Sequence, residues 1–377
     1  MELPHPDVDP GGLLEYSVVF TDRSLNHMSQ RFIGVMQDLV AVLRTTYHAD
    51  GVAVVPGGGT VAMEAVARQL VTGRRALVIR TGLFSYRWSQ ILDVGAVTTD
   101  VTVCTARPDS PARDAAWSPP PPDEVVATIR RARPEVVLAA HVETASGMVL
   151  PDEYVQAVGE ATHEVGGLFV LDAIASGALW VDMAAAGVDV LLSAPQKGWS
   201  GTPGVGYVML ADRGRAAVDA SESTSFAMDL RKWLSIADGY VDGRAAYHST
   251  MPTDAIARNA AVMRETQDRG LESLRASQID LGGQVRALLA ERGFRSVASE
   301  GNEAPGVVVV HTDDPGLQSG ARLREVGIQA AAGVPLMCGE PADFSTCRIG
   351  LFGLDKLADV DGTVARLAAG LDRLQLA

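Results

Sequence analysis

The chain has 377 residues, enough for one large domain and a smaller one rather than a single small core. Its formal net charge of -14 at pH 7 disfavours binding to nucleic acids and to anionic membranes. It has three cysteines, no basic and apolar leader at its N-terminus, and no apolar run of roughly 20 residues; these features predict a cytoplasmic protein without disulfide bonds or membrane spans.

Short apolar runs alternate with amphipathic stretches over the first part of the chain. Continuous apolar runs are typical of strands that are buried on both faces of a parallel sheet. The alternation therefore predicts an α/β fold with a mainly parallel sheet covered by helices. We expect strands at 52–55, 76–79, 136–140, 168–171, 188–192 and 205–210, and helices at about 60–71, 84–93, 123–132 and 151–165.

Two further segments indicate how the chain is organised. A Pro-rich segment at 108–122 predicts a surface loop. A long helical stretch at about 255–291 precedes what we expect to be a smaller α+β part, with strands at 307–311 and around 348–352 and helices near 316–325 and 358–375. The predicted organisation is an N-terminal arm (1–25), a large domain (26–255) and a small C-terminal domain (256–377).

Four polar features follow predicted strands, where open α/β sheets bind their ligands. The first is the turn Pro56-Gly57-Gly58-Gly59-Thr60, which precedes a predicted helix. Its backbone N–H groups suit an oxyanion such as a phosphate, although a tight turn without a ligand is the alternative. The second is Asp172, at the end of a buried strand. A buried carboxylate needs a partner, which could be a protonated pyridine nitrogen, a helix N-terminus or a structural ion pair.

The third and fourth features are basic. Lys197 lies in a loop of small residues after the strand predicted at 188–192. Burial beside a cation would help its amine lose a proton and attack an aldehyde, whereas a solvated loop lysine is the alternative. Arg348 lies among apolar residues of the smaller part and suits the capture of a carboxylate, with an internal salt bridge as its alternative.

In this order, the four features resemble the layout of enzymes that use pyridoxal 5′-phosphate (PLP) and have the aspartate aminotransferase fold. The phosphate requires an anion site, and the pyridine nitrogen requires a carboxylate. The aldehyde requires a lysine, and an amino-acid substrate requires an arginine. No spacing of metal ligands is found, so no metal is expected.

Longer motifs narrow this resemblance to the class V aminotransferases, specifically the alanine–glyoxylate and serine–pyruvate group. HVETASG, starting at His141, resembles the group's H-x-E-[ST]-S-T-G, and GLFSYR, starting at Gly82, resembles G-x-[WF]-G-x-R. LFVLDAIAS resembles L-x-V-D-x-V-[AS]-S, and SAPQKG followed by a Pro-Gly loop resembles G-S-Q-K-x-x-x-x-P-P-G. Weaker similarity covers most of the chain. The resemblance implies PLP-dependent transferase fold type I.

The resemblance also implies a role for each matching residue. Lys197 would form the Schiff base with PLP, and Arg348 would bind the substrate carboxylate. The implied contacts to the cofactor are Gly58, Gly59, Thr60 and Gln196 to the phosphate, Phe84 to the ring face, Thr144 to the ring hydroxyl, Asp172 to the ring nitrogen, and Tyr247 and Thr250 to the phosphate of a neighbouring subunit. The last pair implies a homodimer with shared active sites.

The implied reaction moves an amino group from an amino acid to a small 2-oxo acid such as glyoxylate or pyruvate. The chain departs from the family pattern in the turn Gly57-Gly58-Gly59-Thr60, which lacks the middle serine often found there, at Ala145, and around Asn26-His27-Met28-Ser29. These departures leave the substrates open.

Three alternatives are weighed against transamination. Class V also contains cysteine desulfurases and lyases, for which Cys338 is the candidate nucleophile. A nicotinamide-dependent oxidoreductase is suggested by the match of residues 57–62 to G-x-G-x-x-A, but the next strand ends at Arg80-Thr81 without an acidic residue for the ribose. A non-catalytic binding protein of the same fold is disfavoured, because Asp172 and Lys197 are both present.

Overall fold

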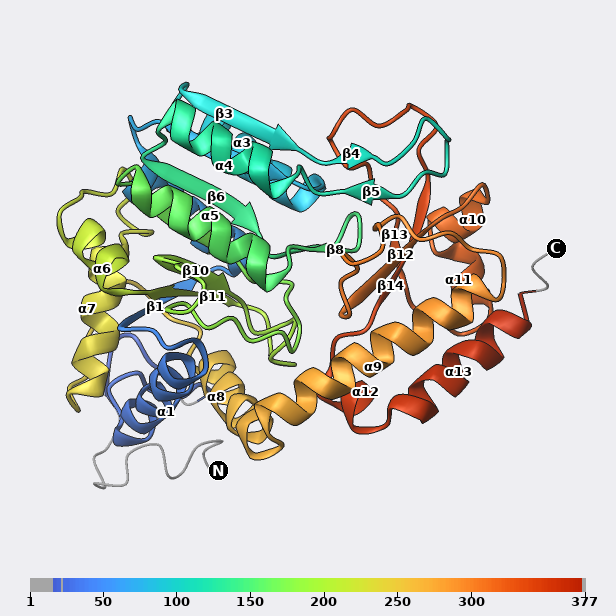
Figure 1. Ribbon diagram of the computed structural model, residues 1–377. Coiled ribbons are helices and arrows are strands. Elements are labelled where there is room, and N and C mark those ends of the chain that lie inside the picture. Colours follow the sequence, from blue (N-terminus) through green and yellow to red (C-terminus); the bar gives the residue numbers. More distant parts are fainter. Residues whose placement is uncertain (1–15, 22, 375–377) are drawn as a thin grey trace.

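The computed structural model describes residues 16–21 and 23–374. Two parts lie side by side (Figure 1): a large part around a seven-stranded sheet and a small part around a three-stranded sheet. Most of the predicted N-terminal arm, residues 1–15 and 22, lies outside the described residues. Every described helix is too short or too polar to cross a bilayer.

The large sheet contains the six strands predicted from apolar runs and one more. The strands are β1 (Gly51–Pro56), β2 (Ala76–Arg80), β3 (Val101–Thr105), β6 (Val136–Ala140), β9 (Leu168–Asp172), β10 (Val190–Ser193) and β11 (Val205–Leu210). Their order is β1-β11-β10-β9-β6-β2-β3. β11 runs antiparallel to both of its neighbours, β1 and β10, and the other neighbouring strands are parallel to one another. The predicted α/β fold with a mainly parallel sheet is therefore confirmed.

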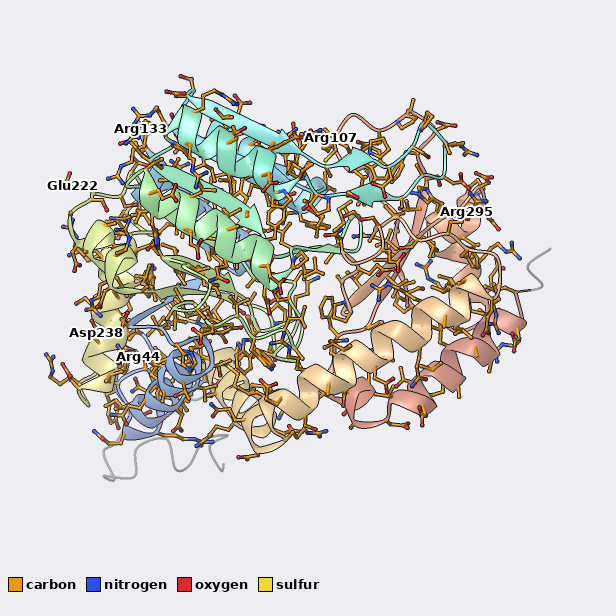
Figure 2. The ribbon with its side chains drawn as sticks, in the orientation of Figure 1. Arg44, Arg107, Arg133, Glu222, Asp238 and Arg295 are labelled. Atoms are coloured by element: carbon orange, nitrogen blue, oxygen red, sulfur yellow. The ribbon has the colours of Figure 1, made fainter. Side chains whose placement is uncertain are left out.

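Helices pack around this sheet and bury its apolar strands. They are α1 (Gln30–Tyr47), α2 (Gly59–Val66) with a π-helical continuation (Ala67–Val71), α3 (Leu83–Val94), α4 (Pro122–Ala132), α5 (Asp152–Glu164), α6 (Asp212–Asp219), α7 (Leu230–Val241) and α8 (Thr253–Asp268). Asp238 of α7 lies close to Arg44 of α1 (Figure 2) and accepts a hydrogen bond from it at 3.3 Å. Asp238 accepts another from Arg215 of α6 at 2.5 Å. These ion pairs tie three helices together at one edge of the large part.

The small part has its own apolar core. It contains β12 (Val307–His311), β13 (Ala331–Ala332), β14 (Thr346–Gly350), α9 (Leu271–Ala290), α10 (Pro315–Gln318), α11 (Ala321–Glu325), α12 (Leu354–Ala358) and α13 (Val360–Asp372). The helix α9 runs from the large part toward the small sheet (Figure 1). The predicted boundary at 255/256 falls within α8, which packs against α1, and it remains a prediction.

Glycines break two helical segments that the sequence pattern predicted as continuous. The stretch at 255–291 divides into α8 and α9 at Gly270, whose φ is 86°. The helix expected near 316–325 divides into α10 and α11 at Gly320, whose φ is 74°. Backbone in this left-handed region cannot continue a right-handed helix, and glycine adopts it at little cost.

The Pro-rich segment at 108–122 is not the plain surface loop that we predicted. It holds the paired strands β4 (Arg107–Pro108) and β5 (Trp117–Ser118), and the ring of Trp117 is buried. The Trp117 N–H donates to the carbonyl of Val297 in the small part at 2.7 Å. Burial of the apolar indole therefore favours packing of this segment against the small part.

Strand β1 excludes the dinucleotide-binding fold suggested by the glycine turn. In that fold the glycine-bearing strand pairs with parallel strands of a βαβ unit. Here β1 lies at the edge of the sheet, and its only described partner is the antiparallel β11. The next strand in the chain, β2, lies near the opposite edge.

The two parts meet beside the hairpin of β7 (Val142–Glu143) and β8 (Met148–Val149). An apolar cluster joins this hairpin to the small part through Ala145, Met148, Val307 and Val309. The Ala304 N–H also donates to the carbonyl of Gly147 at 2.7 Å. This contact places β14 of the small sheet next to the ends of the large-sheet strands.

Candidate active site

Asp172 and the loop that carries Lys197 lie at the ends of two adjacent parallel strands. Asp172 is the last residue of β9 and is the register partner of Leu192 in β10. β10 ends at Ser193, and the following loop brings Lys197 close enough for its charge to act on Asp172. The carboxyl ends of parallel strands are the usual ligand site of an α/β sheet. The fold therefore brings the predicted acid and amine together.

The glycine turn packs against the residues that flank this pair. Gly57 and Gly58 have φ values of 120° and 106°, which favour glycine. A Cβ on Gly59 would lie 2.6 Å from Ile174 Cδ1 and 3.5 Å from Ala194 Cβ, so the backbone approaches closely only without a side chain. No side chain caps the N-terminus of α2, and its first turn holds no acidic residue. These backbone amides and the helix dipole suit an anion.

The carboxyl group of Asp172 is buried and has one hydrogen-bond donor among the described residues, the Ile174 N–H at 3.0 Å from Oδ1. Burial raises the pKa of Asp172 to about 6. The Ile174 N–H lowers this pKa, the charge of Glu143 raises it, and Arg87 and Lys197 lower it by smaller amounts. A cation placed against Oδ2 would offset the burial and hold the carboxylate ionised.

Lys197 is a half-buried amine without an acidic partner at salt-bridge distance among the described residues. Its Nζ lies 5.3 Å from the centre of the Phe352 ring. Burial lowers the pKa of Lys197, the charges of Arg348 and Arg87 lower it further, and Asp172 opposes them. A lowered pKa increases the fraction of neutral amine, which is the form that attacks an aldehyde.

A buried carboxylate holds the predicted stacking ring in place. Oε2 of Glu143 accepts hydrogen bonds from the N–H and the hydroxyl of Ser85, both at 2.8 Å. Oε1 accepts from the Ala145 N–H at 2.9 Å and the Phe84 N–H at 3.3 Å. A Cβ on Gly82 would lie 2.5 Å from Glu143 Cγ, so glycine leaves room for this acid. Glu143 therefore joins the start of α3 to the turn after β7.

Arg348 reaches from β14 of the small part to the large part. Its Nε donates to the carbonyl of Ala332 at 2.7 Å, and its Nη1 donates to the carbonyl of Thr144 at 3.2 Å. Its Cζ lies 5.7 Å from the centre of the Phe84 ring. No carboxylate of the described residues forms a salt bridge with Arg348. The guanidinium is held by neutral carbonyls and keeps its positive charge available to an anion.

The loop of Lys197 is anchored from both parts of the molecule. Ser200 Oγ accepts a hydrogen bond from the Leu354 N–H of α12 at 2.8 Å. Asn259 of α8 binds both backbone groups of Thr202, accepting from its N–H at 2.6 Å and donating to its carbonyl at 3.0 Å. Such fixed positioning is what a reactive side chain needs.

No model of a protein family matches the chain. The chain is 29% identical over 370 residues to 2-aminoethylphosphonate–pyruvate transaminase from Burkholderia pseudomallei strain 668, covering 94% of this chain and 91% of that protein. Its fold is similar to ureidoglycine–glyoxylate aminotransferase from Bacillus subtilis, with a TM-score of 0.77, 21% identity and coverage of 93% and 86% of the two chains. It is also similar to alanine–glyoxylate aminotransferase from Nostoc sp., with a TM-score of 0.76, 22% identity and coverage of 92% and 88%.

The chain is a relative of the class V PLP-dependent aminotransferases. Its fold is that of the PLP-dependent transferases of fold type I, as the sequence motifs predicted. The relatives match this chain over nearly its whole length, and the match includes both the large and the small part.

The side chains of three predicted cofactor contacts form no described hydrogen bond with the glycine turn, Asp172 or Lys197. Gln196 is exposed, and no hydrogen bond of its side chain is found among the described residues. Tyr247 is 53% exposed and hydrogen-bonds Thr250 at 3.4 Å. Its ring lies against His27, with the ring centres 5.4 Å apart, at the edge of a hollow of about 320 Å³. The predicted role of Tyr247 and Thr250 depends on a second subunit and remains a prediction.

The structure disfavours the class V chemistry that uses a loop cysteine. Burial raises the pKa of the Cys338 thiol to about 12, and the charge of Glu340 raises it further. The thiol lies 3.6 Å from the carbonyl oxygens of Arg80 and Leu336. A nucleophilic cysteine needs an electropositive setting that favours its thiolate. The desulfurase alternative is therefore less supported than transamination.

Sequence reasoning did not assign three residues that the fold brings to the site: Arg87, Glu143 and Phe352. Arg87 and Glu143 stand inside the family motifs that we quoted, so the signal was present but unassigned. Phe352 follows the predicted carboxylate-binding Arg348 closely in the chain, but nothing in its spacing indicates a contact with Lys197.

Proposed function

We propose that the chain is a PLP-dependent aminotransferase that moves an amino group from an amine donor to a small 2-oxo acid, pyruvate or glyoxylate. The observation that carries the proposal is the placement of Asp172 and of the loop that carries Lys197 at the ends of adjacent strands, with the glycine turn packed against the neighbouring Ile174 and Ala194. The relatives support it, since their names state transfer of an amino group to pyruvate or glyoxylate.

The residues of the site fit three parts of PLP: its phosphate, its ring nitrogen and its aldehyde. The turn at Gly58 and Gly59 with Thr60, at the uncapped start of α2, would present backbone N–H groups to the phosphate. The buried carboxyl of Asp172 lacks a cationic partner at salt-bridge distance among the described residues, and a protonated ring nitrogen would supply one. Burial lowers the pKa of Lys197 and so raises the fraction of neutral amine, the form that attacks an aldehyde. Phe84 would stack on the ring, and Thr144 would bind its hydroxyl.

PLP, when bound, supplies an aldehyde that links to amines and a ring that withdraws electrons from the carbon bearing the amino group. Asp172 would hold the proton on the ring nitrogen. Lys197 Nζ, once released from the cofactor, would take the proton from the substrate carbon and pass it to the former aldehyde carbon of the cofactor within the same half-reaction. The second half-reaction would reverse this transfer. Its lowered pKa suits this exchange, because an amine that is already protonated cannot act as a base.

Arg348 would bind the anionic group of both substrates. The donor is then an amine with a carboxylate or, as the name of the Burkholderia relative suggests, a phosphonate. Either group suits the hydrogens of the guanidinium that Ala332 and Thr144 do not use. Donor and acceptor would occupy this site in turn, so ping-pong kinetics are expected.

Assembly and location form part of the same proposal. Tyr247 and Thr250 would reach the phosphate site of a second subunit in a homodimer. Their exposure in the single chain supports this role. The free state of Cys104, Cys338 and Cys347 supports a reducing compartment, the cytoplasm. The loop that carries Lys197 is hydrogen-bonded to the small part, which supports a site between the two domains.

The test is to trap the lysine that binds the cofactor. The chain has three lysines, Lys197, Lys232 and Lys356, so the other two are internal controls. The purified protein with PLP is reduced with borohydride and digested, and the modified peptide is sequenced. We expect the label on Lys197 alone, and loss of amino transfer in Lys197→Ala but not in Lys232→Ala. A label on another lysine, or full activity of Lys197→Ala, would contradict the proposal.

A further inference from the structure

A guanidinium lies beside the turn proposed to hold the phosphate. Arg87, on α3, donates from Nη1 to Thr60 Oγ1 at 3.1 Å. Its Cζ lies 5.1 Å from the centre of the Phe84 ring. No carboxylate of the described residues forms a salt bridge with Arg87. A partly buried cation thus stands between the predicted stacking ring and the predicted phosphate turn without an acidic partner of its own.

The residues so far proposed for the phosphate are all neutral. They are Gly58, Gly59, Thr60, Gln196, Tyr247 and Thr250. A phosphate monoester carries roughly −1.5 to −2 charges near neutral pH, and partial burial of such an anion calls for a cation. A helix N-terminus supplies only about half a unit of charge.

The other two cations of the site are committed elsewhere. Lys197 is needed for the aldehyde, which is a separate substituent of the ring. Arg348 is held by the carbonyls of Ala332 and Thr144, in the contact between the two parts. Of the cations whose charges act on Lys197, only Arg87 contacts a residue of the glycine turn.

We propose that Arg87 is the charge partner of the PLP phosphate and orients the Thr60 hydroxyl toward it, an inference that rests on the proposed function. A hydroxyl has a single proton. Because Thr60 Oγ1 accepts a hydrogen bond from Arg87, that proton is free to point at a phosphate oxygen. The remaining N–H groups of the guanidinium can bind the same anion directly, in the fork geometry that phosphates favour.

The experiment compares PLP with pyridoxal, which has the same ring and aldehyde but no phosphate. Removal of Arg87 also changes the field at Lys197, but that effect is the same for both ligands. The affinities of wild type, Arg87→Met, Arg87→Lys and Arg131→Met are measured from the visible absorbance of the bound aldehyde. Arg131 is an exposed arginine on α4 and serves as the charge-matched control.

We expect Arg87→Met to weaken PLP binding roughly 10- to 100-fold, the usual contribution of hydrogen bonds to a charged group. Its affinity for pyridoxal should change by no more than about twofold. Arg87→Lys keeps the charge and should lie between wild type and Arg87→Met. Phosphorus NMR of bound PLP should show a higher phosphate pKa in Arg87→Met than in wild type, a shift that a purely structural role would not cause.

Equal loss of affinity for PLP and pyridoxal in Arg87→Met, or an unchanged phosphate pKa, would overturn the assignment of Arg87 and leave the proposed function intact. Loss of PLP affinity in Arg131→Met equal to that in Arg87→Met would do the same. Failure of the wild-type protein to bind PLP at all would instead reject the proposed function. The two failures are therefore distinguishable.

Discussion

Replacement of Glu143 by glutamine tests whether one buried acid holds two loops of the site together. Its two oxygens accept from three backbone N–H groups and from the Ser85 hydroxyl, at 2.8 to 3.3 Å. A glutamine has the same shape, but its amide nitrogen cannot accept. With that nitrogen on the Ser85 side, the Ser85 hydroxyl can still donate to the Gly82 carbonyl at 2.9 Å, and one backbone N–H loses its partner. With the nitrogen on the other side, the N–H groups of Phe84 and Ala145 both lose theirs.

The less costly orientation leaves one buried N–H unsatisfied, which costs about 1–3 kcal/mol. Glu143→Ala leaves three such N–H groups without their acceptor and should cost more, about 3–6 kcal/mol, a large share of the roughly 5–15 kcal/mol that stabilises a domain. Urea unfolding of the protein without cofactor, followed by circular dichroism, measures both changes. Glu160→Gln, an exposed acid on α5, is the matched control. An unfolding free energy of Glu143→Gln within about 0.5 kcal/mol of the wild-type value would refute this role of Glu143.

Four further predictions follow from single residues. Asp172→Asn should slow amino transfer roughly 100-fold, because the protonated ring nitrogen of PLP would lose a carboxylate partner worth about 3 kcal/mol. Near-normal turnover would count against the pairing of Asp172 with the ring nitrogen. Burial lowers the pKa of His141 from 6.5 to about 4, so its contribution to stability is present above pH 6.5 and is lost as the pH falls toward 4. Over that range, urea titrations should show that wild type loses about 3 kcal/mol of unfolding free energy relative to His141→Gln. Cys338→Ser should keep the transfer rate within about twofold, because its thiol is protonated at working pH; a large loss would revive the nucleophile. Gly198→Ala should destabilise the protein by about 3 kcal/mol or more, since a Cβ there would overlap the carbonyl of Gly177, whereas Gly34→Ala in α1 meets no atom within 4 Å and should stabilise it by about 0.5–1 kcal/mol on melting.

The buried strands were the most predictable part of the fold. Six apolar runs were predicted as strands, and each overlaps an observed strand of the large sheet. The seventh, β3, has the sequence VTVCT and lies at the edge of the sheet. Its side chains are only partly buried, so it lacks the continuous apolar run of a central strand. The helix α1 was not predicted, although its apolar face is buried in the large part.

The place of the candidate site was predictable where a polar residue follows a buried strand. Asp172 and Lys197 met that condition, and the fold brings them together. Their neighbours did not meet it. Glu143 looks in sequence like any acid of a polar turn, and only the fold shows its four donors. Cys338 had an acceptable position for a nucleophile, but its burial beside Glu340 was invisible in the sequence.

The sequence by itself determined the alternation of strands and helices, because burial on both faces of a sheet requires continuous apolar runs and turns require glycine at positive φ. It also determined which residues could perform the chemistry, through motifs whose side chains have few other uses. The tertiary structure alone decided which charges meet. Electrostatic forces depend on distance and burial in space, and residues such as Arg87 and Thr60, or Arg348 and Thr144, come into contact only when separate strands and both parts of the molecule have packed.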